Sequence, residues 1–287
     1  MNYALDALWW RLVDKDVRAL ASLLTAPALW ETGCELPVRL LLGEEGFRYL
    51  LRLDQSPEPL HRHLADEAPF GNRLGRYAES LLAFWFHNAP HAELLTRNLP
   101  VTENGQRAGE LDLVVRLGGV LYHIELTCKY YGAATASPDE MVGLNRSDRL
   151  ADKAAKLAVQ LALPYTPAGT AALQAVGIPM AGMQSASIVH GIGFAGPNQT
   201  FNAKPLNPYG WHGRYLAAGE PLPFEDDVVF YILPRMDLLA PARVELAQCC
   251  GKASIDAAEN ILFAVMEKRP DGLWHENFRL MKPAMQL

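Results

Sequence analysis

Residues 109–131, GELDLVVRLGGVLYHIELTCKYY, decide the fold, because two runs of strand-like sequence meet there at a pair of glycines. Side chains alternate between the two faces of a strand, so Glu110, Asp112 and Val114 share one face of the first run. The same rule groups four polar side chains on one face of the second run: His123, Glu125, Thr127 and Lys129. The other faces predict a core-facing set: Leu111, Leu113, Val115, Tyr122, Ile124, Leu126 and Cys128. Alternation therefore predicts a hairpin with one apolar and one polar face.

The turn of this hairpin is predicted at Gly118 and Gly119, because glycine reaches positive φ at little cost. If the strands pair their polar faces, Asp112 and Glu125 lie close together. Two adjacent carboxylates repel each other, and a shared proton, a cationic side chain or a divalent metal ion relieves that repulsion. A hairpin whose polar face is simply solvated is the alternative interpretation.

Composition predicts a globular protein, because 50% of the 287 residues are hydrophobic and can bury one large core or two modest ones. No run approaches the ~20 apolar residues of a membrane span, and Asp6 and Arg11 stand where a signal peptide would be apolar. Four cysteines without zinc spacing favour a reducing cytoplasm. With a net charge of −6, any contact with nucleic acid must come from a local basic patch.

Periodicity predicts a helical start, then a strand-rich remainder. Helices are expected in 4–30, a strand or hairpin in 35–53, and a loop in the proline-rich 54–72. The next segment carries an apolar stripe at helical spacing: Leu74, Tyr77, Ala78, Leu81, Leu82 and Trp85. Strands are expected at 92–101, 109–117, 120–131, 185–194 and within 226–236, with a closing hairpin around Pro270-Asp271-Gly272. No nucleotide-binding loop, GxSxG elbow or HExxH motif is present, which removes several ordinary enzyme classes.

Glu79 lies beside the apolar stripe of the helix that precedes the hairpin. A carboxylate so close to an apolar face is costly without a partner. By spacing, Arg76 is the candidate partner.

Cationic side chains gather on one face of the helix predicted after the hairpin, with Ser147 or Asp148 as its cap. They fall at i, i+4, i+7 and i+11 together with an amide: Arg149, Lys153, Lys156 and Gln160. Such a face is either solvated or in contact with a phosphate backbone. Further along, the turn-rich stretch 204–221 interleaves aromatic and cationic residues, among them Trp211 and Arg214, which suits either base stacking or packing on the core.

His61 and His63 are the histidines that invite a metal assignment. They fall in the predicted loop, and no third ligand lies near them in the sequence. That context favours surface residues over metal ligands.

Four segments together resemble the PD-(D/E)XK nuclease superfamily, which has the restriction-endonuclease-like fold: RLGRYAES, GELDLVV, HIELTCKYY and RSDRLADKAAKLAVQ. Within it, the chain is similar to a bacterial branch known as domain of unknown function 1853. The resemblance implies that Asp112 and Glu125 bind Mg²⁺ or Mn²⁺, and that Glu79 reaches the same site from the preceding helix. Thr127 stands where the superfamily has its lysine, and Lys129 lies two residues further on.

The resemblance also implies an α/β (α+β) fold with core order α-β-β-β-α-β, a mixed central sheet and flanking helices. The nuclease-like core is expected at 70–195, with a helical extension at 1–69 and a β-rich extension at 196–287, all in one compact unit. The implied activity is metal-dependent hydrolysis of DNA or RNA, in which Lys129 or Lys153 neutralises developing charge.

Two other functions remain open on the sequence. The first is a module that keeps the nuclease fold without catalysis and binds nucleic acid or assembles with proteins. The second is a carboxylate site that acts on some other substrate. No membrane partner is expected, and the sequence does not predict the oligomeric state.

Overall fold

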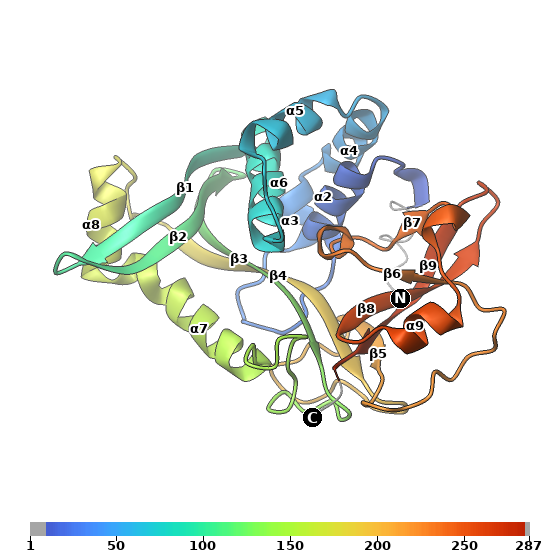
Figure 1. The fold of residues 1–287 in the computed structure, drawn as a ribbon. Helices are drawn as coiled ribbons and strands as arrows, with labels where there is room; N and C mark the ends of the chain where they lie inside the picture. The colour runs from blue at the N-terminus through green and yellow to red at the C-terminus, as the bar shows by residue number, and fades with distance from the viewer. Residues whose placement is uncertain (1–9, 285–287) are drawn as a thin grey trace. The chain divides into compact units, whose positions relative to one another are not determined.

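Helices form the N-terminal part of the chain, and strands dominate the C-terminal part, as expected for this mixed α/β fold (Figure 1). The computed structural model describes residues 10–284. The helices of the N-terminal part are α2 (Lys15–Thr25), α3 (Val38–Leu42), α4 (Gly46–Gln55), α5 (Glu58–Glu67) and α6 (Leu74–Asn88). The predicted helical extension is therefore confirmed from residue 10 onward, and its first nine residues lie outside the described part.

The core order α-β-β-β-α-β is confirmed. After α6 come β1 (Ala92–Glu103), β2 (Gln106–Leu117), β3 (Val120–Gly132), α7 (Leu150–Ala162), η1 (Leu163–Tyr165), α8 (Pro167–Ala175) and β4 (Gln184–Ala195). Every apolar position of the predicted α6 stripe is buried. Gly118 and Gly119 both adopt positive φ, at +54° and +84°, so the two-residue turn of the β2-β3 hairpin is as predicted.

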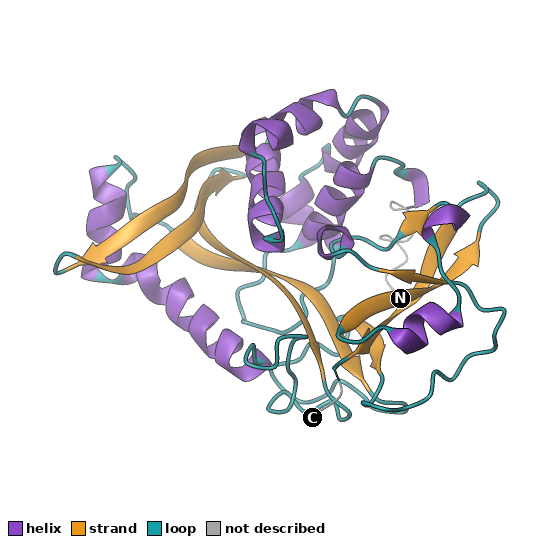
Figure 2. Cartoon of the chain, in the orientation of Figure 1, coloured by secondary structure: helices purple, strands orange, loops and turns teal. Residues whose placement is uncertain are grey.

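The remaining elements are β5 (Trp211–Tyr215), β6 (Phe230–Ile232), η2 (Arg235–Asp237), β7 (Arg243–Val244), η3 (Leu246–Gln248), α9 (Lys252–Ala257), β8 (Ile261–Lys268) and β9 (Trp274–Lys282). The nine strands form one sheet in the order β1-β2-β3-β4-β5-β9-β8-β6, with β7 paired to β9 (Figure 2). Antiparallel pairs dominate, while β5 runs parallel to both of its neighbours. The predicted closing hairpin is β8-β9.

The chain divides into two compact units that do not follow sequence order. Unit 1 contains the residues up to Cys128 together with Ala154–His190, and unit 2 contains Lys129–Lys153 and the residues from Gly191 onward. Strands β3 and β4 each pass from one unit into the other. The division at 69/70 and 195/196 that the sequence suggested stays a prediction.

Unit 1 covers its strands with helices on more than one side. Helices α6 and α8 both pack on β1 (Figure 1). The apolar cluster beneath α8 joins strand residues to the helical segment that follows α7: Leu99, Val101, Leu111, Val114, Leu121, Leu163, Leu173, Ile178 and Met183. Because Val114 belongs to this cluster, the face of β2 that alternation assigned to polar residues is partly buried.

Three predictions about single elements are wrong. The stretch 35–53 forms α3 and α4 rather than a strand, and 54–72 contains α5 rather than a loop. Two prolines suggested the loop, but Pro57 and Pro59 stand at the start of α5, where proline is tolerated, and Leu60 and Leu64 then pack inward at helical spacing. The third is the turn-rich 204–221, which contains strand β5.

Unit 2 has its own apolar core. Its members come from β6, β8, β9, α9 and the segment after β5: Leu216, Leu222, Phe230, Ile255, Phe263, Val265 and Leu280. Across residues 10–284, no helix combines the length and the apolar character that crossing a membrane requires.

Candidate functional site

The β2-β3 hairpin brings Asp112 next to the strand that carries Glu125. The paired register runs down to Leu113 opposite Ile124, so one further step in the same register would place Asp112 opposite Glu125. There the Asp112 side chain bonds to the backbone of β3: its Oδ2 accepts a hydrogen bond of 3.0 Å from the N–H of Leu126. The neighbourhood of the two acids was predictable from alternation and the glycine turn.

Glu125 is fully buried and both of its carboxylate oxygens have side-chain partners. Its Oε1 lies 2.8 Å from Nε2 of His123, and its Oε2 accepts a hydrogen bond of 2.8 Å from the amide of Gln160. The side chains of His123 and Glu125 are 0% and 1% exposed. The pair is therefore held inside the protein, and Gln160 points its amide to Glu125 from α7.

Burial lowers the pKa of His123 to about 4, although the nearby Asp112 carboxylate acts in the opposite direction. The imidazole is therefore neutral at neutral pH and carries one N–H. Its Nδ1 has no hydrogen-bond partner within the described chain, and neither does Oε1 of Gln160. Buried polar atoms of this kind mark places where a donor such as a water molecule is accommodated.

Glu79 on α6 is an acid near Asp112 whose ionisation is shifted by its surroundings. Burial, followed by the charges of Asp112 and Glu110, raises the pKa of Glu79 to about 7, while Arg76 and Arg97 act to lower it. The charges of Asp112 and Glu110 thus add to the effect of burial, which is the larger cause. A divalent cation would favour the ionised form of Glu79, and the oxygens of Glu79 and Asp112 are the kind of ligand that Mg²⁺ or Mn²⁺ takes.

The fit to a three-carboxylate metal site is nevertheless incomplete. Among residues 10–284, one trio of His, Cys, Asp or Glu has all its ligand atoms within 4.8 Å of one another, and it is Asp14, Asp16 and His61. Glu79, Asp112 and Glu125 do not form such a trio. The physical reason is that Glu125 is turned toward His123 and Gln160.

Lys129, expected to complete the motif, is engaged in unit 2. Its Nζ forms an ion pair of 2.5 Å with Oδ2 of Asp148 and lies 5.8 Å from the centre of the Tyr131 ring. Tyr131 donates a hydrogen bond of 2.8 Å to the other oxygen of Asp148. Lys129 and Tyr131 thus hold Asp148 from two sides.

The cationic residues of the predicted nucleic-acid face differ in their surroundings. Arg149 donates a hydrogen bond of 3.0 Å to the backbone oxygen of Asp139 and lines an open pocket of about 500 Å³ in unit 2, together with Arg146 and Tyr215. Lys156 is exposed and Lys153 is half-buried. With the Gln160 amide directed to Glu125, the four positions do not present a uniform basic surface.

Trp211 and Arg214 lie on β5 rather than in an exposed loop. Trp211 is half-buried, and its backbone pairs with Ile192 of β4. Arg214 forms an ion pair of 3.6 Å with Glu220. Both residues keep partly exposed side chains, so their contact with nucleic acid stays a prediction.

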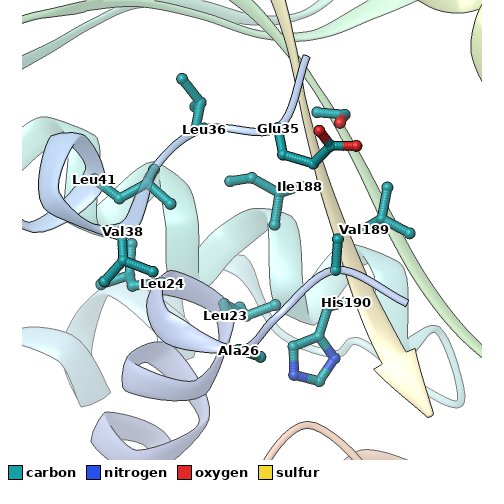
Figure 3. Close-up of a pocket in the computed structure, with 12 residues that line it drawn as sticks. Leu23, Leu24, Ala26, Glu35, Leu36, Val38, Leu41, Ile188, Val189 and His190 are labelled. Carbon is teal, nitrogen blue, oxygen red and sulfur yellow. The ribbon is translucent and has the colours of Figure 1, made fainter. Parts of the chain in front are cut away.

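A small pocket of unit 1 lies between α2, α3 and β4 (Figure 3). Its volume is about 40 Å³, and leucines of α2 and α3 line it with residues of β4. Nearby, Oγ of Ser22 lies 2.9 Å from Nε2 of His190. A space of this size accommodates about one water molecule, so it is no substrate pocket.

A family model described as domain of unknown function (DUF1853) matches residues 18–281. The chain belongs to the DUF1853 family. The DUF1853 match reaches into both units and includes Glu79, Asp112 and Glu125, whereas the motif resemblance covered only 70–195. No curated protein matches this DUF1853 chain, and no solved structure does.

Sequence reasoning missed how His123 and Gln160 of the DUF1853 chain hold Glu125. The available signal was His123 itself, two positions before Glu125 on the same strand face. That face was interpreted as polar and open, but β3 is buried on both faces, including Thr127.

Proposed function

We propose that this DUF1853 protein is a divalent-metal-dependent phosphodiester hydrolase that acts on DNA or RNA. The observation that carries the proposal is the neighbourhood of two carboxylates, Glu79 on α6 and Asp112 on β2, beside the strand that carries Glu125. The element order around it agrees with that expected for a PD-(D/E)XK nuclease core. Mg²⁺ or Mn²⁺ is the proposed ion.

Glu79 and Asp112 are the residues that would hold the ion, and Glu125 is the third acid of the motif. Once bound, such an ion polarises the scissile phosphate and lowers the pKa of a water molecule. His123 and Gln160 each hold one oxygen of Glu125, so the orientation of this buried carboxyl group is fixed. Exposed Lys156, on the same helix as Gln160, would contact a phosphate group.

The biological partner in this proposal is a nucleic acid, and the compartment is the cytoplasm. None of the four cysteines, all of which lie within the described residues, forms a disulfide bond, which suits a reducing environment. Arg149, Trp211 and Arg214 of unit 2 would add phosphate contacts and base stacking of their own.

A second candidate is a non-catalytic module that binds nucleic acid. It is favoured by one observation: Glu125 and Lys129, two members of the catalytic motif, are already bonded to other side chains. Such a module would show salt-sensitive binding without cleavage.

The test compares the wild type with Asp112→Asn for nicking of plasmid and cutting of single-stranded DNA and RNA, with Mg²⁺ or Mn²⁺ and with a chelator. We expect metal-dependent cleavage that falls about 100-fold or more in Asp112→Asn. Asp226→Asn is the matched control, because Asp226 is 95% exposed in its ion pair with Lys252. Unchanged cleavage in Asp112→Asn refutes the assignment, and salt-sensitive binding without any cleavage by the wild type supports the second candidate.

A further inference from the structure

We propose that Asp14, Asp16 and His61 form a binding site for a divalent transition-metal ion, of the zinc and manganese class, that joins the start of α2 to α5. This site shares no residue with the carboxylate site of the proposed function. It is the one trio of potential ligands within 4.8 Å that residues 10–284 contain.

The distances within the trio match a coordination sphere. Nε2 of His61 lies 2.9 Å from Oδ2 of Asp14 and 3.6 Å from Oδ2 of Asp16. Ligand bonds of about 2.0–2.2 Å at angles of about 90° and 120° give atom separations of about 2.9 and 3.6 Å. The two distances to His61 therefore suit an ion held between the imidazole and each carboxylate, and the two carboxylate oxygens lie within 4.8 Å of each other.

Other protein groups orient both carboxylates. Oδ1 of Asp14 accepts hydrogen bonds of 3.0 Å from the backbone N–H groups of Asp16 and Val17. Oδ1 of Asp16 accepts a hydrogen bond of 2.5 Å from the Tyr77 hydroxyl. In each carboxylate, one oxygen accepts hydrogen bonds from protein groups and the other faces His61. Hydrogen bonds of this kind commonly hold metal ligands in place.

Helix capping explains only part of this arrangement. The positive end of α2 stabilises Asp14 and Asp16 at its first turn, and Asp14 is its N-cap. Capping does not require an imidazole from α5, more than forty residues away in the chain, to meet the two remaining oxygens. The imidazole thus adds a nitrogen donor to the two carboxylate oxygens and completes a set of three potential ligands.

The surrounding charge and solvent access also suit a cation. Asp54 adds a third carboxylate, which accepts hydrogen bonds from the backbone N–H groups of Val13 and Asp14. His61 is 45% exposed, while Asp14 and Asp16 are 17% and 27% exposed, so water has access to complete the coordination. One imidazole nitrogen with two carboxylate oxygens suits Zn²⁺, Mn²⁺, Fe²⁺ or Co²⁺ better than Ca²⁺, which takes oxygen ligands.

Helix α6 separates this site from the carboxylate site. Tyr77, which holds Asp16, and Glu79 stand two positions apart on α6. At about 100° per residue their side chains point about 200° apart, toward opposite sides of the helix. Metal binding at one site is therefore separable from binding at the other by mutation.

The experiment titrates Co²⁺ into the full-length protein and follows its visible absorption, with Zn²⁺-dependent thermal melting as a second readout. We expect the wild type to bind Co²⁺ with a ligand-field band and to gain melting temperature with Zn²⁺. His61→Gln keeps an N–H donor for Asp14 and removes the imidazole ligand, so affinity should fall at least tenfold. Asp16→Asn keeps the side-chain shape and should weaken binding in the same direction.

Two controls make the result specific. His63→Gln changes the neighbouring histidine of α5, which lies 3.5 Å from Glu67 in a comparable pair outside the trio. His63→Gln should leave the Co²⁺ titration unchanged. Asp112→Asn changes the carboxylate site of the proposed function, so it should remove only the Co²⁺ bound there and keep the band that His61→Gln removes. Melting without metal checks that each variant is folded.

The proposal is overturned if the wild type shows neither the Co²⁺ band nor a Zn²⁺-dependent gain in melting temperature. It is also overturned if the folded His61→Gln and Asp16→Asn variants bind Co²⁺ as the wild type does. Binding that only Asp112→Asn removes would assign the ion to the carboxylate site instead. If Asp112→Asn loses cleavage but keeps the Co²⁺ band, the result supports this site and concerns the proposed function separately.

Discussion

At the scale of one residue, the surroundings of Glu79 change the pH at which it ionises. Burial is the largest cause that raises the pKa of its carboxyl group, and the nearby charges of Asp112 and Glu110 raise this pKa further. Because the folded pKa of about 7 lies above the ordinary 4.5, the folded state binds more protons than the unfolded state between these values. Glu79 therefore contributes most to stability below about pH 4.5, and its contribution is lost as the pH rises through 7.

Glu79→Gln should remove this dependence in metal-free protein. We expect the variant to be more stable than the wild type by ~2 kcal/mol at pH 8, less than the full shift implies because Glu79 is only partly buried. Between pH 5 and 7.5 its unfolding free energy should vary less than that of the wild type. Urea unfolding at several pH values, in the presence of a chelator, measures both quantities. Parallel curves for the two proteins would show that Glu79 ionises normally.

His123 is expected to matter through the buried carboxylate that it holds. His123→Ala removes the hydrogen-bond partner of Oε1 of Glu125 and should cost ~2 kcal/mol of unfolding free energy, because a buried polar atom then loses its partner. His123→Gln retains an N–H donor and should cost clearly less. Denaturant unfolding at pH 7 compares the two variants. Equal losses would mean that the imidazole acts by packing alone.

At the scale of the element, β5 is a strand whose neighbours on both sides approach closely. Gly213 of β5 is paired with Phe194 of β4, and a Cβ there would lie 2.6 Å from the backbone oxygen of Arg279 and closer still to the Phe194 ring. A methyl group at this position would force strands apart, since the backbone cannot rotate out of the way.

Gly213→Ala should therefore destabilise unit 2 by ~2–3 kcal/mol through overpacking. Gly251→Ala is the matched control, because a Cβ at Gly251 meets no atom within 4 Å and φ there is −90°. We expect the control to stay within ~0.5 kcal/mol of the wild type. Thermal and urea unfolding measure both variants, and a Gly213→Ala protein as stable as the control would contradict this account of β5.

Elements differ in how far their own sequence predicted them. The β2-β3 hairpin was predictable because Gly118 and Gly119 fix the turn and alternation then fixes the faces. Helix α5 was not, because prolines at a helix start and prolines in a loop leave the same local signal. Strand β5 was missed because it is only five residues long and contains a glycine, Gly213. A larger side chain there would clash with Phe194 and Arg279, which are distant in the sequence.

At the scale of the whole molecule, the N-terminal helical segment packs against α6. The indole N–H of Trp85 donates a hydrogen bond of 3.0 Å to the backbone oxygen of Leu41, and Tyr77 bonds to Asp16 of α2. In addition, residues 129–153 belong to the same compact unit as the C-terminal strands. The family match agrees, since it runs from 18 to 281.

A fragment of residues 70–195 should consequently fail to fold on its own. It would expose the buried face of α6, including Trp85, and separate 129–153 from the rest of unit 2. We expect no cooperative thermal transition and a weak near-ultraviolet circular dichroism signal, whereas the full chain shows both. A cooperative transition of the fragment near the melting temperature of the full chain would establish 70–195 as an independent domain.

The sequence by itself determined what depends on neighbours along the chain: the α6 stripe, the glycine turn, the strands and the approach of Asp112 to the strand of Glu125. Local spacing encodes these features because each follows from a periodicity of 3.6 or 2 residues. Only the tertiary structure decided that both faces of β3 are buried, that Gln160 bonds to Glu125, and that His61 meets Asp14 and Asp16. Those outcomes depend on which surfaces distant elements cover, and no local pattern carries that information.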